Sequence, residues 1–284
     1  MLPKITFKSN PLTLAGRQLA VGMSAPDFRA VTGDLKETGL ADFKGKIKLI
    51  GSFPSLDTPV CDLQVKEFNK QAGALSAEIA VLGISRDLPF AQSRFCSLNE
   101  IKNETVLSDY KYSSFGINYG LLIRELNLLA RAALIIDKND ILRYFQVSPE
   151  LTQGLDYAEA FGNLEAVLKN PGGQAGPEKL PAHCKPCEGA VPALSRDKAA
   201  GLLARLKGWS LLEDKKIVKE FNFKDFNEGK CFLDLVALIA GEQGHHPALA
   251  LSYGKLKITL TTHAANGLTE NDFIMAGIID TLSA

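Results

Sequence analysis

Hydrophobic and polar positions change their period several times along the first half of the chain, and each change predicts an element. Residues 47–53 have the pattern of a strand, and residues 79–84 are a short apolar run whose length and flanks are typical of a buried strand. Between them, apolar side chains at positions 61, 65, 68 and 72 would share one face of a helix. The remaining elements predicted in this half are helices at 88–97 and 157–168 and strands at 130–136 and 141–147. Strands that alternate with helices predict an α/β domain.

The second half of the chain has a different pattern. Residues 255–261 alternate between apolar and polar positions, as a half-buried strand does, and 209–223 contains further strand-like stretches. The helices expected around these strands are 196–206, 225–240 and 270–282. We therefore expect a small α+β domain with an antiparallel sheet packed on helices.

A segment rich in proline and glycine separates the two halves. Residues 169–181 hold three prolines and three glycines, which support neither a helix nor a central strand. A length of 284 residues also suits two domains. The predicted organisation is a first domain at 1–168, a linker at 169–182 and a second domain at 183–284.

Charge and hydropathy narrow the classes of function. Lys+Arg and Asp+Glu balance at 32 each, so the chain lacks the excess of basic residues that would indicate a nucleic-acid partner. The chain contains no run of 18 apolar residues, so a membrane helix is not expected. The strand-like start at 1–8 does not resemble a secretory signal. We expect a cytoplasmic protein. Its five cysteines are an odd number for a disulfide-stapled domain, so each is interpreted separately.

Cys61 stands where a reactive cysteine would be placed. A buried strand ends at 53, a turn bounded by prolines follows, and the predicted helix begins near Cys61. The first turn of a helix has unpaired N–H groups and the positive end of the dipole, which stabilise a thiolate. A lone cysteine at a helix start is more often structural, so the surrounding residues have to decide.

Three segments around this cysteine resemble a known family. They read PSLDTPVC at 54–61, DLPFAQSRFC at 87–96 and LLARA at 128–132. As a set, they resemble the signature of the peroxiredoxins, and within it the thiol peroxidase branch with two cysteines in one chain. The resemblance extends over nearly all of 1–168. It implies a thioredoxin-like fold and the reduction of hydroperoxides.

The resemblance also implies a role for each matching residue. Cys61 would be the peroxidatic thiolate, and Cys96 the resolving cysteine that converts its sulfenic acid into a disulfide. Thr58 would hydrogen-bond the sulfur and the peroxide, and Pro54 would shield the site from water. Arg131 would hold the thiolate and stabilise charge as the O–O bond breaks. Thioredoxin or a similar dithiol is implied as the reductant.

A second set of residues carries another resemblance, over roughly 180–284. It consists of HHP at 245–247, Tyr253, His263 and the segment GLTEND ending at Asp272, together with GW at 208–209 and FNFKDF at 221–226. This set resembles the pterin-4a-carbinolamine dehydratases. The implied reaction removes water from a 4a-hydroxytetrahydropterin, which is acid/base chemistry suited to histidine. We expect His245, His246 and His263 to be the acid/base set, with Asp272 orienting one of them or holding the substrate.

Some features of the second half leave alternatives open. Three histidines can also hold a metal ion, but two adjacent ones point in different directions, so we expect neither a metal nor a cofactor. Cys184 and Cys187 form a CxxC pair, which can be a redox pair or half a zinc site. The pair follows a linker and has no second pair, so we favour no special role. Gly241 departs from the acidic or polar residue common in the family, and Glu242 is a possible substitute.

Two main hypotheses follow. The first is a bifunctional enzyme with hydroperoxide and pterin substrates, which we expect to form a homo-oligomer. The alternative is a peroxidase whose C-terminal domain only binds pterin or assembles subunits. A third and weaker idea makes Cys184 and Cys187 an internal reductant for Cys61 and Cys96.

Overall fold

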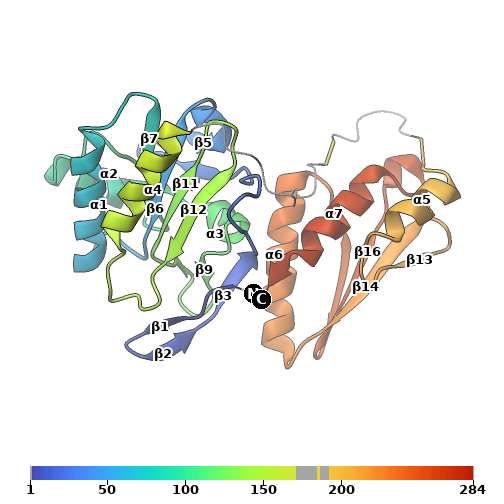
Figure 1. Cartoon of the computed structure of the whole chain (residues 1–284). Helices are drawn as coiled ribbons and strands as arrows, with labels where there is room; N and C mark the ends of the chain where they lie inside the picture. The colour runs from blue at the N-terminus through green and yellow to red at the C-terminus, as the bar shows by residue number, and fades with distance from the viewer. Residues whose placement is uncertain (1, 171–183, 186–191, 284) are drawn as a thin grey trace. The chain divides into compact units, whose positions relative to one another are not determined.

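The computed structural model describes residues 2–170, 184–185 and 192–283 of the chain. The chain divides into two compact units (Figure 1), the first reaching to Lys179 and the second running from Leu180 to Leu282. Residues 171–182, most of the predicted linker, lie outside the described residues. Each unit is described by itself below.

A seven-stranded mixed sheet forms the centre of the first unit. Its order is β12 (Leu142–Val147), β11 (Ala132–Ile136), β6 (Ile47–Ser52), β7 (Ile79–Ser85), β8 (Thr105–Ser108), β4 (Arg29–Val31) and β5 (Glu37–Gly39). The three middle strands β6, β7 and β8 are parallel, and every other neighbouring pair is antiparallel. All residues of β6, β7 and β11 are buried, which explains why their sequences are mostly apolar rather than alternating; Lys48 of β6 is a buried exception.

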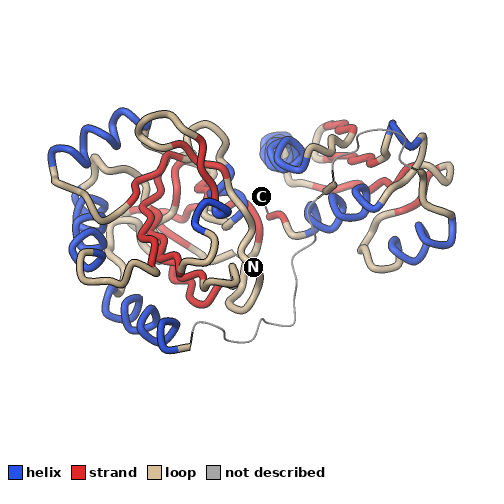
Figure 2. The backbone as a smooth tube through the Cα atoms, turned by 90° about the horizontal axis from the view of Figure 1, so that it is seen from above, coloured by secondary structure: helices blue, strands red, loops and turns tan. Residues whose placement is uncertain are grey.

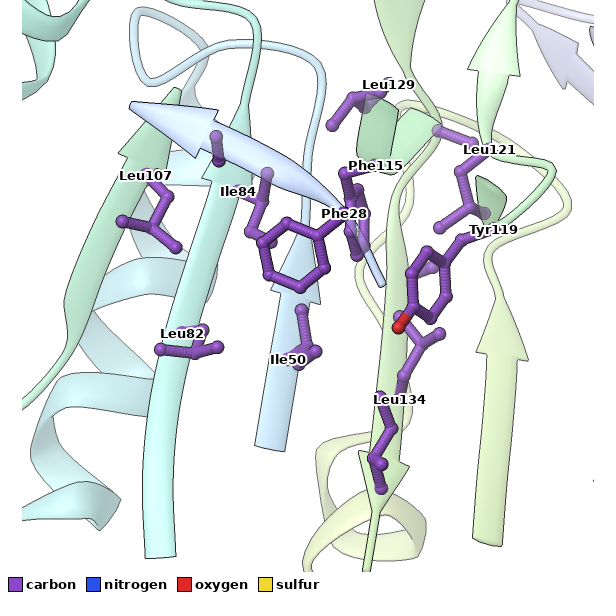
Figure 3. Packing of buried hydrophobic residues seen from close by; sticks show 14 of the residues in the cluster. Phe28, Ile50, Leu82, Ile84, Leu107, Phe115, Tyr119, Leu121, Leu129 and Leu134 are labelled. Carbon is purple, nitrogen blue, oxygen red and sulfur yellow. The ribbon is translucent and has the colours of Figure 1, made fainter. Parts of the chain in front are cut away.

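Side chains pack on both faces of this sheet. On one face, the aromatic rings of Phe28, Phe115 and Tyr119 pack beside strand residues such as Ile50 and Leu134 (Figure 3). The helices of the first unit are α1 (Pro59–Ala72), α2 (Pro89–Leu98), α3 (Ser114–Asn118) and α4 (Tyr157–Lys169). Residues of α1 and α4 pack with the opposite face in a second buried cluster. The alternation of strands and helices predicted for 47–168 is thus confirmed.

Several short elements surround the sheet, and the sequence pattern did not show most of them. They are the hairpin β1 (Ile5–Phe7) and β2 (Asn10–Leu12), the strands β3 (Leu14–Arg17), β9 (Leu122–Ile123) and β10 (Leu128–Leu129), and the 3-10 helix η1 (Leu40–Phe43). Segments of two to four residues are too short to display a period. Arg131 lies just before β11 and not inside the strand, as the predicted range 130–136 had placed it.

The second unit has a four-stranded antiparallel sheet beside three helices. The strand order is β13 (Ser210–Leu212), β14 (Lys216–Asn222), β16 (Lys255–Leu260) and β15 (Ala248–Ser252). The other elements of this unit are α5 (Arg196–Leu203), α6 (Phe226–Gln243), η2 (His263–Ala265) and α7 (Glu270–Asp280). The last described element of the chain is β17 (Leu282–Ser283). Figure 2 shows strands and helices of this unit from above.

The core of the second unit follows the predicted periods. Leu256, Ile258 and Leu260 of β16 are buried, while Lys255 and Lys257, which alternate with them, are exposed. Helix α6 packs against β15 and β16, and it buries Phe232 and Val236. The predicted antiparallel sheet on helices is confirmed. The edge strand β15 was not predicted, because it buries no residue and its alanines and leucines do not alternate with polar residues. Among the described helices, none is long and apolar enough to cross a membrane.

Candidate active sites

Cys61 lies in the first turn of α1, in the interior of the first unit. The helix begins at Pro59 with Thr58 as its N-cap residue, and proline at this position suits a helix start. Strand β6 ends nine residues before Cys61, at Ser52, and the intervening turn brings the chain back over the sheet. The Cys61 side chain is 0% exposed and packs with Phe53, Leu56 and Val65.

Two side chains donate hydrogen bonds to the sulfur of Cys61. The hydroxyl of Thr58 lies 2.8 Å from Sγ, and Nη2 of Arg131 lies 3.3 Å from it. Both groups donate, so both stabilise negative charge on the sulfur, and the guanidinium adds a full positive charge in a buried setting. The structure therefore brings together three of the residues singled out in the sequence, although Arg131 is 70 positions from Cys61.

Arg131 is itself held by groups that the sequence did not point to. Its Nη1 donates to Oε1 of Gln64 at 2.9 Å, and its Nη2 donates to the carbonyl oxygen of Leu151 at 3.1 Å. Gln64 donates in turn to the carbonyl oxygen of Ser52 at 3.2 Å. These neutral partners fix the guanidinium without neutralising it. A buried arginine was expected to need partners, and these are the partners.

The turn that precedes α1 is tied to the start of α2 by Asp87. One carboxylate oxygen accepts the hydroxyl of Ser55 at 2.7 Å, and the other accepts the backbone N–H of Leu56 at 2.8 Å. Pro54, in the same turn, is buried. Asp87 belongs to the DLPFAQSRFC segment, but its structural part in the site was not foreseen.

Cys96 lies near the end of α2 and is half-buried. Burial first, and the nearby Glu104 carboxylate second, raise the pKa of its thiol to about 11. Cys61 and Cys96 are both free thiols, so the structure represents the reduced form of the protein. A thiol with so high a pKa is a weak nucleophile at neutral pH while α2 stays folded.

In the second unit, His245 and Asp272 form a buried pair. Nε2 of His245 lies 2.8 Å from Oδ1 of Asp272, and the two side chains are almost inaccessible. The second oxygen, Oδ2, accepts the hydroxyl of Thr262 at 2.8 Å and the backbone N–H of Thr269 at 2.8 Å. Asp272 is thereby fixed on three sides. It can hold the imidazole of His245 in one orientation.

The other two histidines have different surroundings. His246 follows His245 directly and is exposed, and His263 begins η2 and is exposed as well. Within the described ranges, neither side chain has a hydrogen-bonding partner in the protein. The pair His245 and Asp272 is thus assembled by the fold, while His246 and His263 are free to meet a substrate.

The segment that precedes the dehydratase-like part is anchored near this pair. The backbone N–H of Cys184 donates to Gln243 at 2.9 Å, and that of Lys185 donates to the side chain of Asn271 at 2.9 Å. Cys187, the second cysteine of the CxxC pair, lies outside the described residues. In the described part of the chain, no group of three or more His, Cys, Asp or Glu residues could hold a metal ion. Cys231, on α6, is half-buried.

One feature of the second site that was not predicted, the capping role of Asp272, could have been recognised in the sequence. Thr269 stands three residues before Asp272 and directly before the apolar run of α7, which is the spacing of a helix capping box. Gln64 had no comparable signal. It lies one helical turn after Cys61, but only the folded chain shows that it meets Arg131.

Comparison with known families agrees with both sets of residues. Residues 20–168 match the family described as Redoxin, and residues 192–282 match the family described as Pterin 4 alpha carbinolamine dehydratase. The first match covers more than half of the chain. The chain belongs to the Redoxin family. The second match identifies the second unit as a domain of the dehydratase family.

Relatives and solved structures specify the redoxin part further. It is 42% identical to the thiol peroxidase of Oceanobacillus iheyensis over 163 residues, which are 57% of this chain and 99% of the relative. It is also 42% identical to the thiol peroxidase of Bacillus subtilis over 168 residues, 59% of this chain and 100% of that protein. The part up to residue 168 is therefore a thiol peroxidase domain.

Solved structures confirm the thioredoxin-like peroxiredoxin fold. A peroxiredoxin-like protein from Aquifex aeolicus is 39% identical, with a TM-score of 0.56, 59% of this chain covered and 98% of the other. A thiol peroxidase from Chromobacterium violaceum shares the fold at 18% identity, with a TM-score of 0.54, 60% of this chain covered and 99% of the other. The chain is an enzyme with a thiol peroxidase part and a pterin dehydratase part.

Proposed function

We propose that the first unit reduces hydroperoxides with Cys61 as the nucleophile and Cys96 as the resolving cysteine. The observation that supports this most directly is the convergence of Thr58 and Arg131 on Sγ of Cys61, at 2.8 Å and 3.3 Å. Both groups would also reach a peroxide bound at the sulfur. They would stabilise the oxygen that leaves when the O–O bond breaks.

The proposed reaction balances in two steps. The Cys61 thiolate attacks one peroxide oxygen, an S–O bond forms, the O–O bond breaks, and the leaving oxygen takes up a proton to give water or an alcohol. Cys61 is oxidised to a sulfenic acid. The Cys96 thiol then forms an S–S bond with Cys61, and the displaced hydroxide leaves as water with the thiol proton. A dithiol of the thioredoxin type, available in the cytoplasm, would reduce the disulfide.

Ionisation of the thiol alone would not account for such an enzyme. An ordinary cysteine is only a few per cent ionised at pH 7, so complete ionisation would raise its reactivity about thirty-fold. Enzymes usually accelerate reactions about a million-fold or more. Orientation of the peroxide and stabilisation of the leaving oxygen must supply the rest, which is why Thr58 and Arg131 belong to the proposal.

We further propose that the second unit dehydrates a 4a-hydroxytetrahydropterin to the quinonoid dihydropterin. One group must protonate the departing hydroxyl, and another must accept the proton of the ring N–H. The buried pair of His245 and Asp272 supports an acid/base role for His245. His246 and His263 are exposed, as groups that meet the substrate directly would be.

The same exposure also favours a second candidate. Since His246 and His263 have no protein partner among the described residues, they can be surface histidines of a domain that only binds pterin or assembles subunits. The two candidates differ in one measurable property, which is turnover of the carbinolamine.

One experiment on the full-length protein tests both activities. Hydroperoxide reduction with thioredoxin is measured beside carbinolamine dehydration in the wild type, Cys61→Ser, Cys96→Ser and His245→Ala. We expect Cys61→Ser to abolish peroxide reduction and to leave dehydration unchanged. Cys96→Ser should consume one equivalent of peroxide and then stop, because thioredoxin should not be able to recycle it. His245→Ala should lose dehydration by at least about a hundred-fold, the scale typical of a lost acid/base group, and keep peroxide reduction.

The outcomes separate the candidates. Full peroxide turnover by Cys61→Ser would overturn the role of this cysteine. A wild-type protein that binds pterin but does not dehydrate it would favour the binding or assembly role of the second unit.

A further inference from the structure

Helix α2, which carries Cys96, rests on the sheet through polar groups. Its fully buried residues are Pro89 and Gln92 only. Gln92 donates through Nε2 to the hydroxyl of Ser85 at 3.0 Å and to the carbonyl oxygen of Leu107 at 2.9 Å. Its Oε1 is buried and has no partner among the described residues. A helix that buries so little apolar surface has low local stability.

A second polar group lies buried close to the same helix. Glu104 precedes β8 and is 7% exposed, and its Oε2 has no hydrogen-bonding partner in the described part of the chain. The carboxyl group lies over Gly83 of β7. A Cβ at position 83 would stand 2.4 Å from Oε1 of Glu104 and 3.3 Å from the ring of Phe53. Glu104 therefore occupies the space that the missing side chain leaves.

This position adjoins the surroundings of both cysteines of the proposed reaction. Phe53 belongs to the cluster that contains Cys61, and Phe95, Ile101 and Val106 pack against that cluster. Phe95 precedes Cys96, and the other two flank Glu104 in sequence. The carboxyl group and Cys96 are close enough to act on each other electrostatically.

Few other charges face Glu104. Phe53, the residue after β6, and Gly83 of β7 lie beside it, α2 contributes Cys96, and Cys61 of α1 lies in the neighbouring cluster. On its own loop, Glu100 and Lys102 are exposed. Burial raises the pKa of Glu104 well above its usual range. The folded protein thus favours a neutral carboxyl group at a site where it gains no hydrogen bond on Oε2.

We propose that Glu104 is a positioning residue for the resolving step, and that its unpartnered buried carboxyl group promotes an opening of α2 that delivers Cys96 to Cys61. The inference rests on the proposed roles of these two cysteines. When α2 opens, Glu104 becomes hydrated and ionises, and Cys96 is released from the burial that is the main cause of the raised pKa of its thiol. Closing requires the carboxyl group to be neutral again.

The sign of the pH dependence follows from linkage. A carboxyl group with a raised pKa in the closed state stabilises closure fully only below its ordinary pKa, near 4 to 4.5. As pH rises above that value, the open state loses its proton first, and opening becomes favourable by up to about tenfold for each pH unit. The gain ends when pH reaches the pKa of Glu104 in the closed state.

The test measures opening directly. Amide hydrogen exchange of α2 is recorded in reduced full-length protein between pH 5.5 and 7.5, and each rate is divided by the intrinsic rate at that pH. We expect the opening constant to rise with pH, by up to about tenfold for each pH unit, in the wild type and in Glu100→Gln, an exposed matched control. In Glu104→Gln and Glu104→Val it should stay flat. Amides of β6 report global unfolding, and their exchange should not show this difference between the wild type and the Glu104 variants.

A kinetic measurement connects opening to resolution. After one equivalent of hydroperoxide, the rate of Cys61–Cys96 disulfide formation at pH 7.5 should fall at least tenfold in Glu104→Gln and remain unchanged in Glu100→Gln. The inference would be overturned if the opening constant of α2 in Glu104→Gln rose with pH as it does in the wild type. A wild-type rate of disulfide formation in Glu104→Gln would also overturn it. The exchange experiment involves no peroxide, so its result is separate from the outcome for Cys61→Ser.

Discussion

At the scale of single residues, the surroundings of Cys61 depend on one long-range partner. Thr58 is three positions away and belongs to the same helix start, whereas Arg131 comes from the segment just before β11. Among the described residues, the guanidinium donates to Gln64, to the carbonyl oxygen of Leu151 and to the sulfur, and it has no carboxylate partner. Its charge is therefore directed at Cys61 instead of being neutralised by an ion pair.

Removal of this guanidinium should affect catalysis more than folding of the site. We expect Arg131→Met to lower kcat/KM for hydroperoxide by about a hundred- to a thousand-fold, because the leaving oxygen loses its charged donor. Steady-state peroxide reduction measures the effect. Arg124→Met, at a more exposed arginine of the same unit, is the matched control and should keep full activity. An Arg131→Met protein with wild-type kcat/KM would show that the charge has no part in the reaction.

At the scale of elements, the first turn of α7 joins helix formation to the second site. Asp272 accepts the backbone N–H of Thr269, the residue before the helix, and also holds His245 and the hydroxyl of Thr262. The same carboxylate thus stabilises the helix start and orients the histidine. Acidic residues in a first turn also interact favourably with the helix dipole.

Replacement of Asp272 should therefore change both stability and activity. We expect Asp272→Asn to lower the free energy of unfolding by about 1 to 3 kcal/mol, because buried donors lose a charged acceptor. Carbinolamine dehydration should fall by at least about tenfold as His245 loses its orienting partner. Chemical denaturation and the dehydration assay measure the two effects. Glu270→Gln, exposed in the same turn, should change neither, and equal behaviour of the two variants would contradict the role of Asp272.

At the scale of the whole molecule, each unit contains the residues of its own candidate site. Cys61, Thr58, Arg131 and Cys96 belong to the first unit, and His245 and Asp272 to the second. Cys184 is anchored through its backbone to Gln243 in the second unit. This division favours two independent activities over a relay of thiols between the units.

Independent units predict that the CxxC pair is dispensable for peroxide reduction. We expect the double variant Cys184→Ser and Cys187→Ser to keep wild-type turnover with thioredoxin, since Cys96 resolves Cys61 within the first unit. Turnover is measured over many equivalents of peroxide, and Cys231→Ser is the control for loss of an unrelated thiol. A double variant that stops after one equivalent would instead support the pair as an internal reductant.

The sequence by itself determined the local part of this protein. The patterns at 47–53 and 79–84 were sufficient to predict two strands, the second of them buried. The turn before Cys61 was sufficient to predict a helix start, because proline fixes the backbone within a few residues. The motifs around Cys61 and His245 indicated both families.

Only the tertiary structure decided which distant groups meet and which are buried. It brought Arg131 to Cys61 and added Gln64 as its support, it buried His245 on Asp272 while leaving the adjacent His246 exposed, and it enclosed Glu104 above Gly83. These outcomes depend on how strands and helices pack. The period of a sequence shows which face of an element is apolar, but it does not show what the polar groups on that face will contact.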